Sequence, residues 1–312
     1  RAPARRGRAM RADVAVLIVS YNTERELVRC LESLRAQRRS VTQQVVVLDN
    51  ASSDGSVAAV RERFGEVELV ASPENLGFAR GVNLAAARAD ADFLLLLNPD
   101  TVVLDHAVDE LVAFARAHPG HGLYGGRTVR PDGALEPSSC WALPTLWSTL
   151  MFVTGLSSLA RGSRWLDPES MGGWARDTVR EVDVVTGCLM LVPRAAWDQL
   201  GGFDERYFMY GEDADLALRA RAAGLRPIVC PDAVVVHEVG RASAHRADKL
   251  LLLFRGKATL MRCHWRGPRR ALGLALLAGG VAARALLARD AAWATLWRQR
   301  RTWLRGFPAP AT

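Results

Sequence analysis

The first hundred residues alternate between short apolar runs and segments in which apolar positions have helical spacing. The runs are uninterrupted, which is typical of strands buried on both faces of a sheet. The pattern predicts strands at 14–19, 45–48, 67–70 and 93–97, with helices at 24–37, 57–64, 78–88 and 106–118. This alternation favours an α/β fold with a mostly parallel sheet flanked by helices.

The second half of the chain is less regular. Pro, Gly, Ser and Trp are frequent between residues 127 and 180, which predicts long loops and short helices that cover a site. Regular structure is expected to resume with a strand at 182–192, a helix that begins near residue 211 and a strand pair around 226–236.

The C-terminal segment contains an apolar run at 271–283, which Arg284 interrupts before residues 285–288 continue it. A run of this length is shorter than the about twenty residues that a bilayer span requires. Arg and Trp residues flank it, which leaves two interpretations open: a helix at a membrane surface, or a helix packed on the preceding domain. We therefore expect a basic extension (1–12), a main domain (13–260) and a basic amphipathic helical tail (261–312).

The formal net charge of +8 is unevenly distributed. Residues 1–11 carry +5 and residues 261–312 carry +9, so the stretch between them is acidic. An acidic body with basic ends fits attachment to an anionic membrane surface better than a nucleic-acid groove, and no nucleic-acid partner is expected. The five Cys form no C-x-x-C pair and the Arg-rich start lacks an apolar segment, so we expect a cytoplasmic protein at the inner face of the cell membrane.

Polar residues follow several of the predicted strands. They are Tyr21 and Asn22, Asp49 and Asn50, and Asn98 and Asp100. In open α/β sheets, ligands bind in the crevice outside the carboxyl ends of the strands. These side chains are therefore expected to line one crevice.

Two groups of residues in the chain could carry chemistry. Asp100 offers the hard oxygen ligand that a divalent cation on a diphosphate requires, although Asn-Pro-Asp alone is also a turn signal. Glu212, Asp213 and Asp215 crowd into one helix start, where acids can simply complement the helix dipole. Beside aromatic residues, such carboxylates should perturb one another's pKa values, as a general base requires. His237 ends an apolar strand and could be structural or a ligand.

Several common site motifs are absent from the sequence. Residues 74–83 are rich in Gly and Asn but are not a G-x-G-x-x-G, and the chain has no P-loop. It also has no G-x-S-x-G, which argues against a serine hydrolase of the usual kind.

Five segments together resemble one family. They are Val-Ser-Tyr-Asn (19–22), Leu-Asp-Asn-Ala-Ser-Ser-Asp-Gly-Ser (48–56), Asn-Leu-Gly-Phe-Ala-Arg-Gly-Val-Asn (75–83), Leu-Asn-Pro-Asp (97–100) and the acidic-aromatic stretch 201–216. In this order they are similar to family 2 inverting glycosyltransferases, especially the bacterial rhamnosyltransferase-like branch. The resemblance covers about residues 13–245 and implies a GT-A fold.

The resemblance also implies roles for individual residues. Asp100 and His237 would bind Mg²⁺ or Mn²⁺, with Asn98 in place of the first Asp of the family's D-x-D motif. Asp213 would be the catalytic base, with Glu212 the second candidate. The donor would contact Tyr21, Asn22, Asp49, Asn75, Gly77, Arg80, Asn83 and Asn98.

The expected function is inverting transfer of a sugar, with rhamnose the leading candidate, from a nucleoside-diphosphate sugar. The acceptor would be a cell-envelope glycan or a lipid-linked molecule. The alternative is an inactive relative that only binds nucleotide-sugars or membranes. A sugar nucleotidyltransferase is disfavoured because no glycine-rich loop with Arg or Lys follows the first strand.

Overall fold

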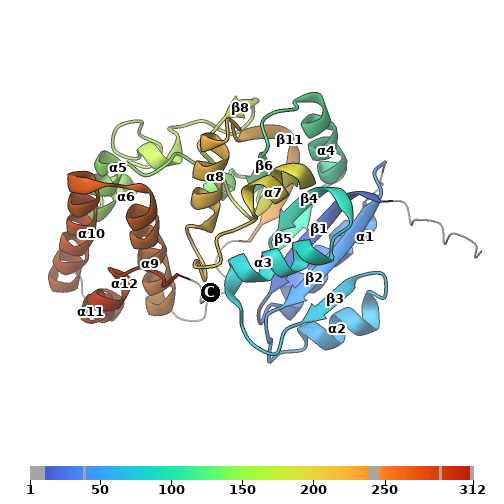
Figure 1. Ribbon diagram of the computed structural model, residues 1–312, viewed down its shortest axis with the longest axis horizontal. Helices are drawn as coiled ribbons and strands as arrows, with labels where there is room; N and C mark the ends of the chain where they lie inside the picture. The colour runs from blue at the N-terminus through green and yellow to red at the C-terminus, as the bar shows by residue number, and fades with distance from the viewer. Residues whose placement is uncertain (1–10, 38–39, 239–245, 288–289, 310–312) are drawn as a thin grey trace, which may run out of the picture.

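The computed structural model describes residues 11–37, 40–238, 246–287 and 290–309. A twisted sheet with helices on both faces forms one side of the molecule, and a group of helices forms the other (Figure 1). The first part of the chain supplies the strands β1 (Ala12–Ser20), β2 (Gln43–Asp49), β3 (Glu68–Ala71), β4 (Ala91–Leu97) and β5 (Thr101–Val103). It also supplies the helices α1 (Glu24–Ala36), α2 (Ser56–Arg63), α3 (Gly77–Arg88) and α4 (Ala107–Ala117).

The main sheet is mostly parallel, as predicted. Its order is β3-β2-β1-β4-β10-β6-β11-β5, where β6 is Tyr124–Val129, β10 is Leu189–Pro193 and β11 is Ile228–His237. β10 runs antiparallel to both β4 and β6, and β5 and the short β8 (Arg180–Glu181) run antiparallel to β11. The other six strands all run in the same direction, so their carboxyl ends meet at one edge.

Two predicted strand segments are arranged differently from expectation. The expected strand at 182–192 is divided: β9 (Val184–Val185) pairs with β7 (Cys140–Trp141) in a small separate sheet, and β10 belongs to the main sheet. Gly187 lies in the break, where a Cβ would come 2.9 Å from the ring of Phe78. The expected strand pair at 226–236 is the single strand β11, whose pairing with β6 shifts register between Val229 and Val234. Pro231 lies inside that shift and has no N–H to donate.

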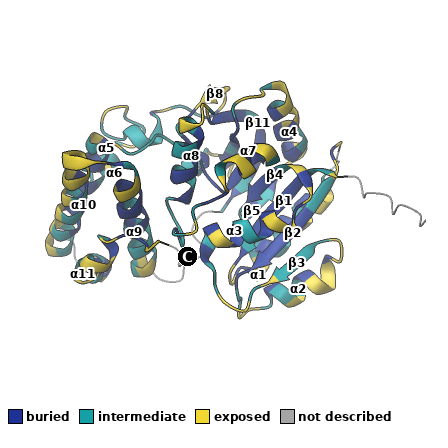
Figure 2. Cartoon of the chain, in the orientation of Figure 1, coloured by how far each residue is buried: buried dark blue, intermediate teal, exposed yellow. Residues whose placement is uncertain are grey.

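Each face of the sheet is covered by three helices. Apolar residues of α1, α2 and α4 pack on one face. Those of α3, α7 (Arg194–Leu200) and α8 (Glu212–Ala222) pack on the other. The strands between them are almost completely buried, which explains their uninterrupted apolar runs (Figure 2).

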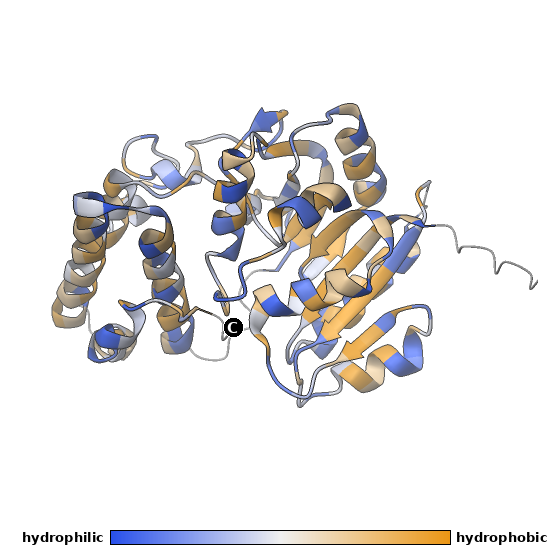
Figure 3. Cartoon of the chain, viewed as in Figure 1, coloured by the Kyte–Doolittle hydropathy of each residue, from blue (hydrophilic) through white to orange (hydrophobic). Residues whose placement is uncertain are grey.

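The helical group consists of α5 (Leu146–Thr154), α6 (Leu156–Leu159), α9 (Arg246–His264), α10 (Gly267–Leu287), α11 (Ala291–Arg298) and α12 (Arg300–Trp303). It has its own apolar core, in which Phe254, Trp265 and Trp303 pack with residues of α5, α10 and α11. Much of the remaining surface of α10 is also apolar (Figure 3). Of the two interpretations left open for the tail, packing on the preceding domain therefore holds for the inner face of these helices.

Two expectations about the tail change. α9 runs across the boundary expected between residues 260 and 261, so the helical part begins at Arg246. α10 has 21 residues and is long and apolar enough to span a membrane by length and composition, whereas the uninterrupted run at 271–283 suggested a segment that is too short. The helix is longer than the run because it also includes Arg269, Arg270 and Arg284.

Candidate active site

The strand-end cavity, of about 370 Å³, opens at the carboxyl edge of the parallel strands. Tyr21 follows β1, Asn50 follows β2, Asn98 follows β4, and His237 is the last residue of β11; all four line the cavity. The structure thus brings together strand-end residues that lie more than two hundred positions apart in the chain. This is the crevice expected from the predicted sheet.

Asp100 and His237 lie side by side in this cavity. β5 pairs antiparallel with the end of β11, which aligns His237 with Thr101. His237 Nε2 is 3.2 Å from Asp100 Oδ1, and the two side chains are 7% and 10% exposed. The other ring nitrogen, Nδ1, is 2.9 Å from the hydroxyl of Ser138 and is thereby held in orientation.

Asp100 and His237 could together bind a divalent cation whose remaining ligands come from a bound substrate. Within the described residues no group of three or more His, Cys, Asp or Glu side chains forms a metal cluster. A carboxylate and an imidazole would hold a cation from one side, leaving its other positions for phosphate oxygens or water. The hydrogen-bonded Nδ1 is the outer contact that metal-binding histidines usually have.

Glu212 and Asp213 begin α8 and line the same cavity. The turn before them depends on Gly211, whose φ of +103° lies in the left-handed region and whose position against the Tyr207 ring leaves no room for a side chain. Glu212 is buried, and its Oε2 has no hydrogen-bond partner among the described atoms. Asp213 accepts a hydrogen bond from the N–H of Ala214.

Burial raises the pKa values of both carboxyls. Burial, reinforced by the neighbouring Asp213, raises the pKa of Glu212 well above its ordinary value. Burial also raises the pKa of Asp213, to about 6, because backbone N–H groups partly offset the desolvation. Because its pKa of about 6 lies below neutral pH, Asp213 is largely ionised there and can act as a base, and the raised pKa of Glu212 favours the neutral form of that neighbour.

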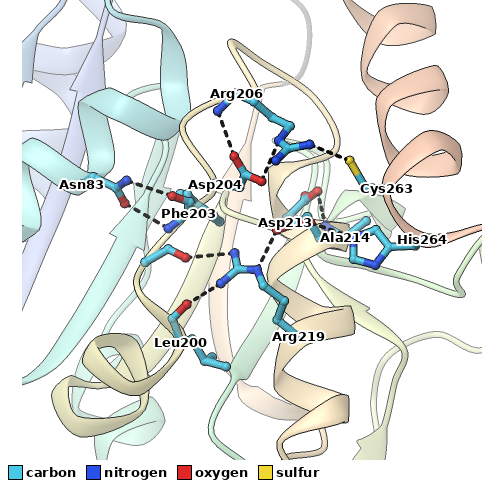
Figure 4. Close-up of polar contacts among 12 residues, drawn as sticks. Asn83, Leu200, Phe203, Asp204, Arg206, Asp213, Ala214, Arg219, Cys263 and His264 are labelled. Atoms are coloured by element: carbon cyan, nitrogen blue, oxygen red, sulfur yellow. Dashed lines mark hydrogen bonds and ion pairs between the residues drawn. The ribbon is translucent and has the colours of Figure 1, made fainter. Parts of the chain in front are cut away.

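Asp215, the third acid of the run, has a structural role. Its carboxylate is 2.7 Å from Arg219 Nε and 2.7 Å from His264 Nε2. Arg219 also donates to the carbonyls of Leu200 and Gly202, so this network ties α8 to the preceding loop and to α9 (Figure 4). Only two of the three crowded carboxylates are thus free to act in the cavity.

Five of the expected donor residues do not line the strand-end cavity. Asn83 exchanges two hydrogen bonds with the backbone of Phe203, which fixes α3 to the loop before α8 (Figure 4). Arg80 is exposed and lies 3.8 Å from Glu205. Asn22 accepts a hydrogen bond from Ser53 N at 2.8 Å.

The other two, Asp49 and Gly77, support the cavity from behind its wall. Asp49 is buried after β2; its Oδ1 accepts from Ser52 N, and its Oδ2 has no partner among the described atoms. Gly77 has φ +79° and approaches the backbone of Phe208 so closely that a Cβ would lie 2.4 Å from its carbonyl oxygen. Its own carbonyl accepts from Asn50 Nδ2, so Gly77 positions a cavity residue.

Several cavity residues were missed by the sequence analysis, notably Trp141, Thr186 and Lys249. Trp141 comes from the irregular middle of the chain, where the periodic pattern gives no placement. Thr186 lies at the break in the strand that was expected to be continuous at 182–192. Lys249 could have been noticed, because only two of the 41 basic residues are lysines, Lys249 and Lys257. Both lie on α9 and both line cavities at this site.

A second cavity, of about 440 Å³, adjoins the first. The two share Trp141, Tyr210, Glu212 and Asp213. The second cavity is otherwise lined mainly by α5, α9 and residues 167–169, among them Phe152, Glu169 and Lys257. Glu212 and Asp213, the candidates for the base, therefore lie between two cavities, one at the edge of the sheet and one against the helical group.

The mostly parallel sheet, the Asp beyond the end of β4 and the carboxylates at the start of α8 are the arrangement that the resemblance to GT-A glycosyltransferases implies. Residues 15–162 match Glycosyl transferase family 2, and residues 177–246 match the N-terminal domain of galactosyltransferase. The chain is 31% identical over 281 residues to N-acetylglucosaminyl-diphospho-decaprenol L-rhamnosyltransferase of Mycobacterium tuberculosis, which covers 82% of this chain and 87% of that protein. The chain belongs to glycosyl transferase family 2.

Further similarities agree with this assignment. Rhamnosyltransferase WbbL of Escherichia coli is 29% identical over 236 residues, covering 72% of this chain and 83% of that protein. The mannosyltransferase PcManGT of Pyrobaculum calidifontis, solved with GDP-Man and Mn²⁺, has the same fold with a TM-score of 0.56 at 21% identity, covering 95% of this chain and 84% of that chain. GalNAc-T7, solved with UDP, GalNAc and Mn²⁺, gives a TM-score of 0.60 at 14% identity, covering 94% and 55%. The expected family, fold and enzyme class are confirmed.

Proposed function

We propose that this glycosyltransferase is an inverting enzyme that moves a sugar from a nucleoside-diphosphate donor in the strand-end cavity to an acceptor hydroxyl in the second cavity. The observation that carries the proposal is that the two cavities meet at Asp213. A base in this position can take the proton of an acceptor that attacks the donor sugar from the side opposite its diphosphate. A single displacement of this kind inverts the anomeric centre.

The donor end of the reaction uses the groups around Asp100. The resemblance assigns the nucleobase to Asp49, whose buried Oδ2 has no partner among the described atoms; because Asp49 does not line the cavity, the base would have to reach beyond the cavity wall to contact it. Asp100 and His237 would hold a divalent cation, Mg²⁺ or Mn²⁺, which supplies positive charge to the diphosphate when it is bound. Lys249 adds a cation from α9 to the same cavity. These groups stabilise the charge that grows on the leaving nucleoside diphosphate.

The acceptor end of the reaction depends on Asp213. Its carboxylate takes the proton from the acceptor hydroxyl while the new bond from that oxygen to the anomeric carbon forms. The bond between the anomeric carbon and the phosphate oxygen breaks in the same step, and the electron pair leaves with the diphosphate. Glu212 is the second candidate for this base, because it adjoins Asp213 and lines both cavities.

Rhamnose is the donor sugar we propose first, and a lipid-linked molecule or a cell-envelope glycan is the acceptor. Two relatives are named as rhamnosyltransferases, and one of these names specifies N-acetylglucosaminyl-diphospho-decaprenol. Such an acceptor resides in a membrane, so we propose that the protein acts at the cytoplasmic face of the cell membrane. The exposed apolar side chains of α10, such as Leu272 and Leu286, and its exposed Arg269 and Arg270 suit that surface.

The experiment that tests this function is an assay of purified protein with Mn²⁺ and a panel of thymidine, uridine and guanosine diphosphate sugars. The expected result is release of nucleoside diphosphate and appearance of an acceptor extended by one sugar of inverted anomeric configuration. The alternative is an inactive relative that only binds nucleotide-sugars or membranes. Binding of a donor without turnover, with every acceptor tried, would favour that alternative.

A further inference from the structure

A third hollow, the α10 groove, runs between α5 and α10 and has a volume of about 720 Å³. Its wall is apolar and includes Val153, Leu272, Leu276, Gly279 and Leu287. A Cβ on Gly279 would meet nothing within 4 Å, so this position of the groove has open space for a larger side chain. The groove lies outside the chemistry of the active site, yet it is formed by the same helix, α5, that lines the second cavity.

Large hydrophobic side chains that are exposed occur mainly in two segments of the described chain. Ten large hydrophobic side chains are exposed among the described residues, and seven of them lie in residues 147–165 or on α10. These seven are Trp147, Leu156, Leu159, Trp165, Leu272, Leu286 and Leu287. Leu272 and Leu287 of this set line the groove, so part of the exposed apolar surface is suited to an apolar ligand.

Two cations lie where the groove meets the second cavity. Lys257 Nζ is 4.9 Å from the centre of the Phe152 ring, and Arg284 Cζ is 5.6 Å from the same centre. Lys257 lines the second cavity and Arg284 lines the groove, so Phe152 separates the two hollows with a positive charge near each. Nη1 of Arg284 is buried without a hydrogen-bond partner among the described atoms. A buried guanidinium nitrogen in that state is suited to a ligand oxygen.

The interior of the second cavity has the opposite charge. Asp167, Glu169, Glu212 and Asp213 line it, and Lys257 is its one basic residue. A phosphate deep among four carboxyls would be repelled, whereas a neutral sugar can donate its hydroxyl protons to them and rest its apolar face on Trp141. Lys257 lies 3.5 Å from Glu169 in an ion pair that a phosphate at the cavity mouth could share.

We propose that a lipid-linked acceptor lies along these three features in order: its sugar in the second cavity, its diphosphate beside Phe152 near Lys257 and Arg284, and its isoprenoid chain in the α10 groove. The order of neutral, anionic and apolar parts in such a molecule matches the order of acidic, basic and apolar surfaces on the protein. This inference rests on the proposed function, because it places the parts of that reaction's acceptor.

The first test changes the groove and the lipid together. Transfer is measured in one detergent with two acceptors, N-acetylglucosaminyl diphosphate carried on decaprenyl and on geranyl, for the wild type and the Gly279→Trp variant. The matched control is Ala271→Trp, which adds the same ring to an exposed position of α10 that does not line the groove. We expect Gly279→Trp to raise KM for the decaprenyl acceptor by on the order of tenfold, with a smaller effect on the geranyl acceptor, because it excludes buried hydrocarbon.

The second test changes the charge at the junction. Arg284→Gln is compared with Arg270→Gln, which removes the same charge from an exposed position of the same helix. The acceptors are the geranyl diphosphate compound and an uncharged alkyl glycoside of the same sugar. We expect Arg284→Gln to raise KM about tenfold or more for the diphosphate acceptor only, as the loss of a charged hydrogen bond predicts.

Binding of the decaprenyl acceptor is also measured directly, by quenching of tryptophan fluorescence, so that the groove is tested apart from catalysis. If no acceptor is extended but Gly279→Trp still weakens binding of the decaprenyl acceptor, the proposed function is overturned and the inference about the groove is supported. Equal KM values for both chain lengths, unaffected by Gly279→Trp, would overturn the inference. A second result would also overturn the inference. If Gly279→Trp no longer sediments with acceptor-free liposomes but shows no effect of acceptor chain length, the groove contacts bulk membrane and not the acceptor.

Discussion

The sheet with its flanking helices and the helical group meet at the same two carboxylates, but they present different chemistry there. The sheet side offers polar strand ends, with Asp100 and His237 in a cavity suited to a charged donor. The helical side offers aromatic and aliphatic walls and an exposed apolar helix. Under the proposed function, two separately built parts of the chain would therefore receive the donor and the acceptor.

The parts also differ in how they are held together. The sheet is fixed by continuous ladders of backbone hydrogen bonds between buried strands. The helical group is held by side-chain packing and by a few polar links such as Asp215 to His264. Donor binding should therefore tolerate damage to the helical group better than transfer does.

The largest expected effect comes from the carboxylate at which the two parts meet. Asp213→Asn should lower the transfer rate by about a hundredfold or more, because a general base is lost. Donor affinity, measured by thermal shift, should change little, because the side chain faces the acceptor. Glu212→Gln is the matched variant and should be milder, because burial raises the pKa of Glu212 and so favours the neutral form, which Gln resembles. If Glu212→Gln is the inactive variant and Asp213→Asn retains activity, Glu212 is the base.

The next largest effect is expected on donor binding, from substitutions on the sheet side. His237→Ala and Asp100→Ala should each weaken Mn²⁺-dependent donor binding by on the order of a hundredfold, and Ser138→Ala by about tenfold, because Ser138 only orients the ring. Titration of Mn²⁺ against donor affinity measures these changes. His121→Ala, which lies outside the cavity, is the control. An unaltered metal requirement in His237→Ala would mean that this histidine is structural.

The pH dependence of transfer should report the base. Because the pKa of Asp213 is raised to about 6 by burial, the reactive carboxylate is lost as pH falls through 6. Below that value the rate should decline by about tenfold per pH unit, while donor binding declines less. The rate at saturating donor and acceptor is measured between pH 5 and 8. A rate that is flat down to pH 5 would contradict the assignment of the ionised base.

The same pKa shift has an effect on stability. The folded protein holds the proton of Asp213 more tightly than the unfolded chain does, so this residue makes folding less favourable as pH rises from about 4 through 6. Asp213→Asn should therefore melt at a higher temperature than the wild type at pH 8, by about 2–4 °C, and the difference should shrink at pH 4. Melting curves at both pH values check this, and equal melting temperatures at pH 8 would contradict it.

The smallest effect concerns the link between the two parts. His264→Ala removes the contact between α9 and Asp215 and should lower stability by about 1–3 kcal/mol, because Asp215 keeps only Arg219 as a charged partner. Thermal unfolding measures the loss, and His118→Ala on the far face of the sheet is the control. Transfer should fall with donor binding preserved. A parallel fall in donor binding would show that the two parts do not act separately.

The sequence alone determined the class of sheet, the crevice at its carboxyl edge and the residues most directly attached to it. Uninterrupted apolar runs predict buried parallel strands, and a polar residue directly after such a run lies near the carboxyl edge of the sheet, although Asn22 and Asp49 lie there without lining the cavity. Tyr21, Asn98, Asp100 and His237 follow from this rule, together with the family resemblance. Asp213 also lies where that resemblance implies, at the start of a helix that faces the cavity.

Only the tertiary structure decided which polar residues face the cavity and which serve the fold. Asn83 is as polar as Asn75, but it is hydrogen-bonded to the backbone of Phe203. Asp215 is as acidic as Asp213, but it is paired with His264. Such pairings join residues far apart in the chain, so no local pattern can predict them. The tail follows the same rule: its arginines and apolar positions are evident in the sequence, whereas the groove beside Gly279 exists only because α5, more than a hundred residues earlier, packs against α10.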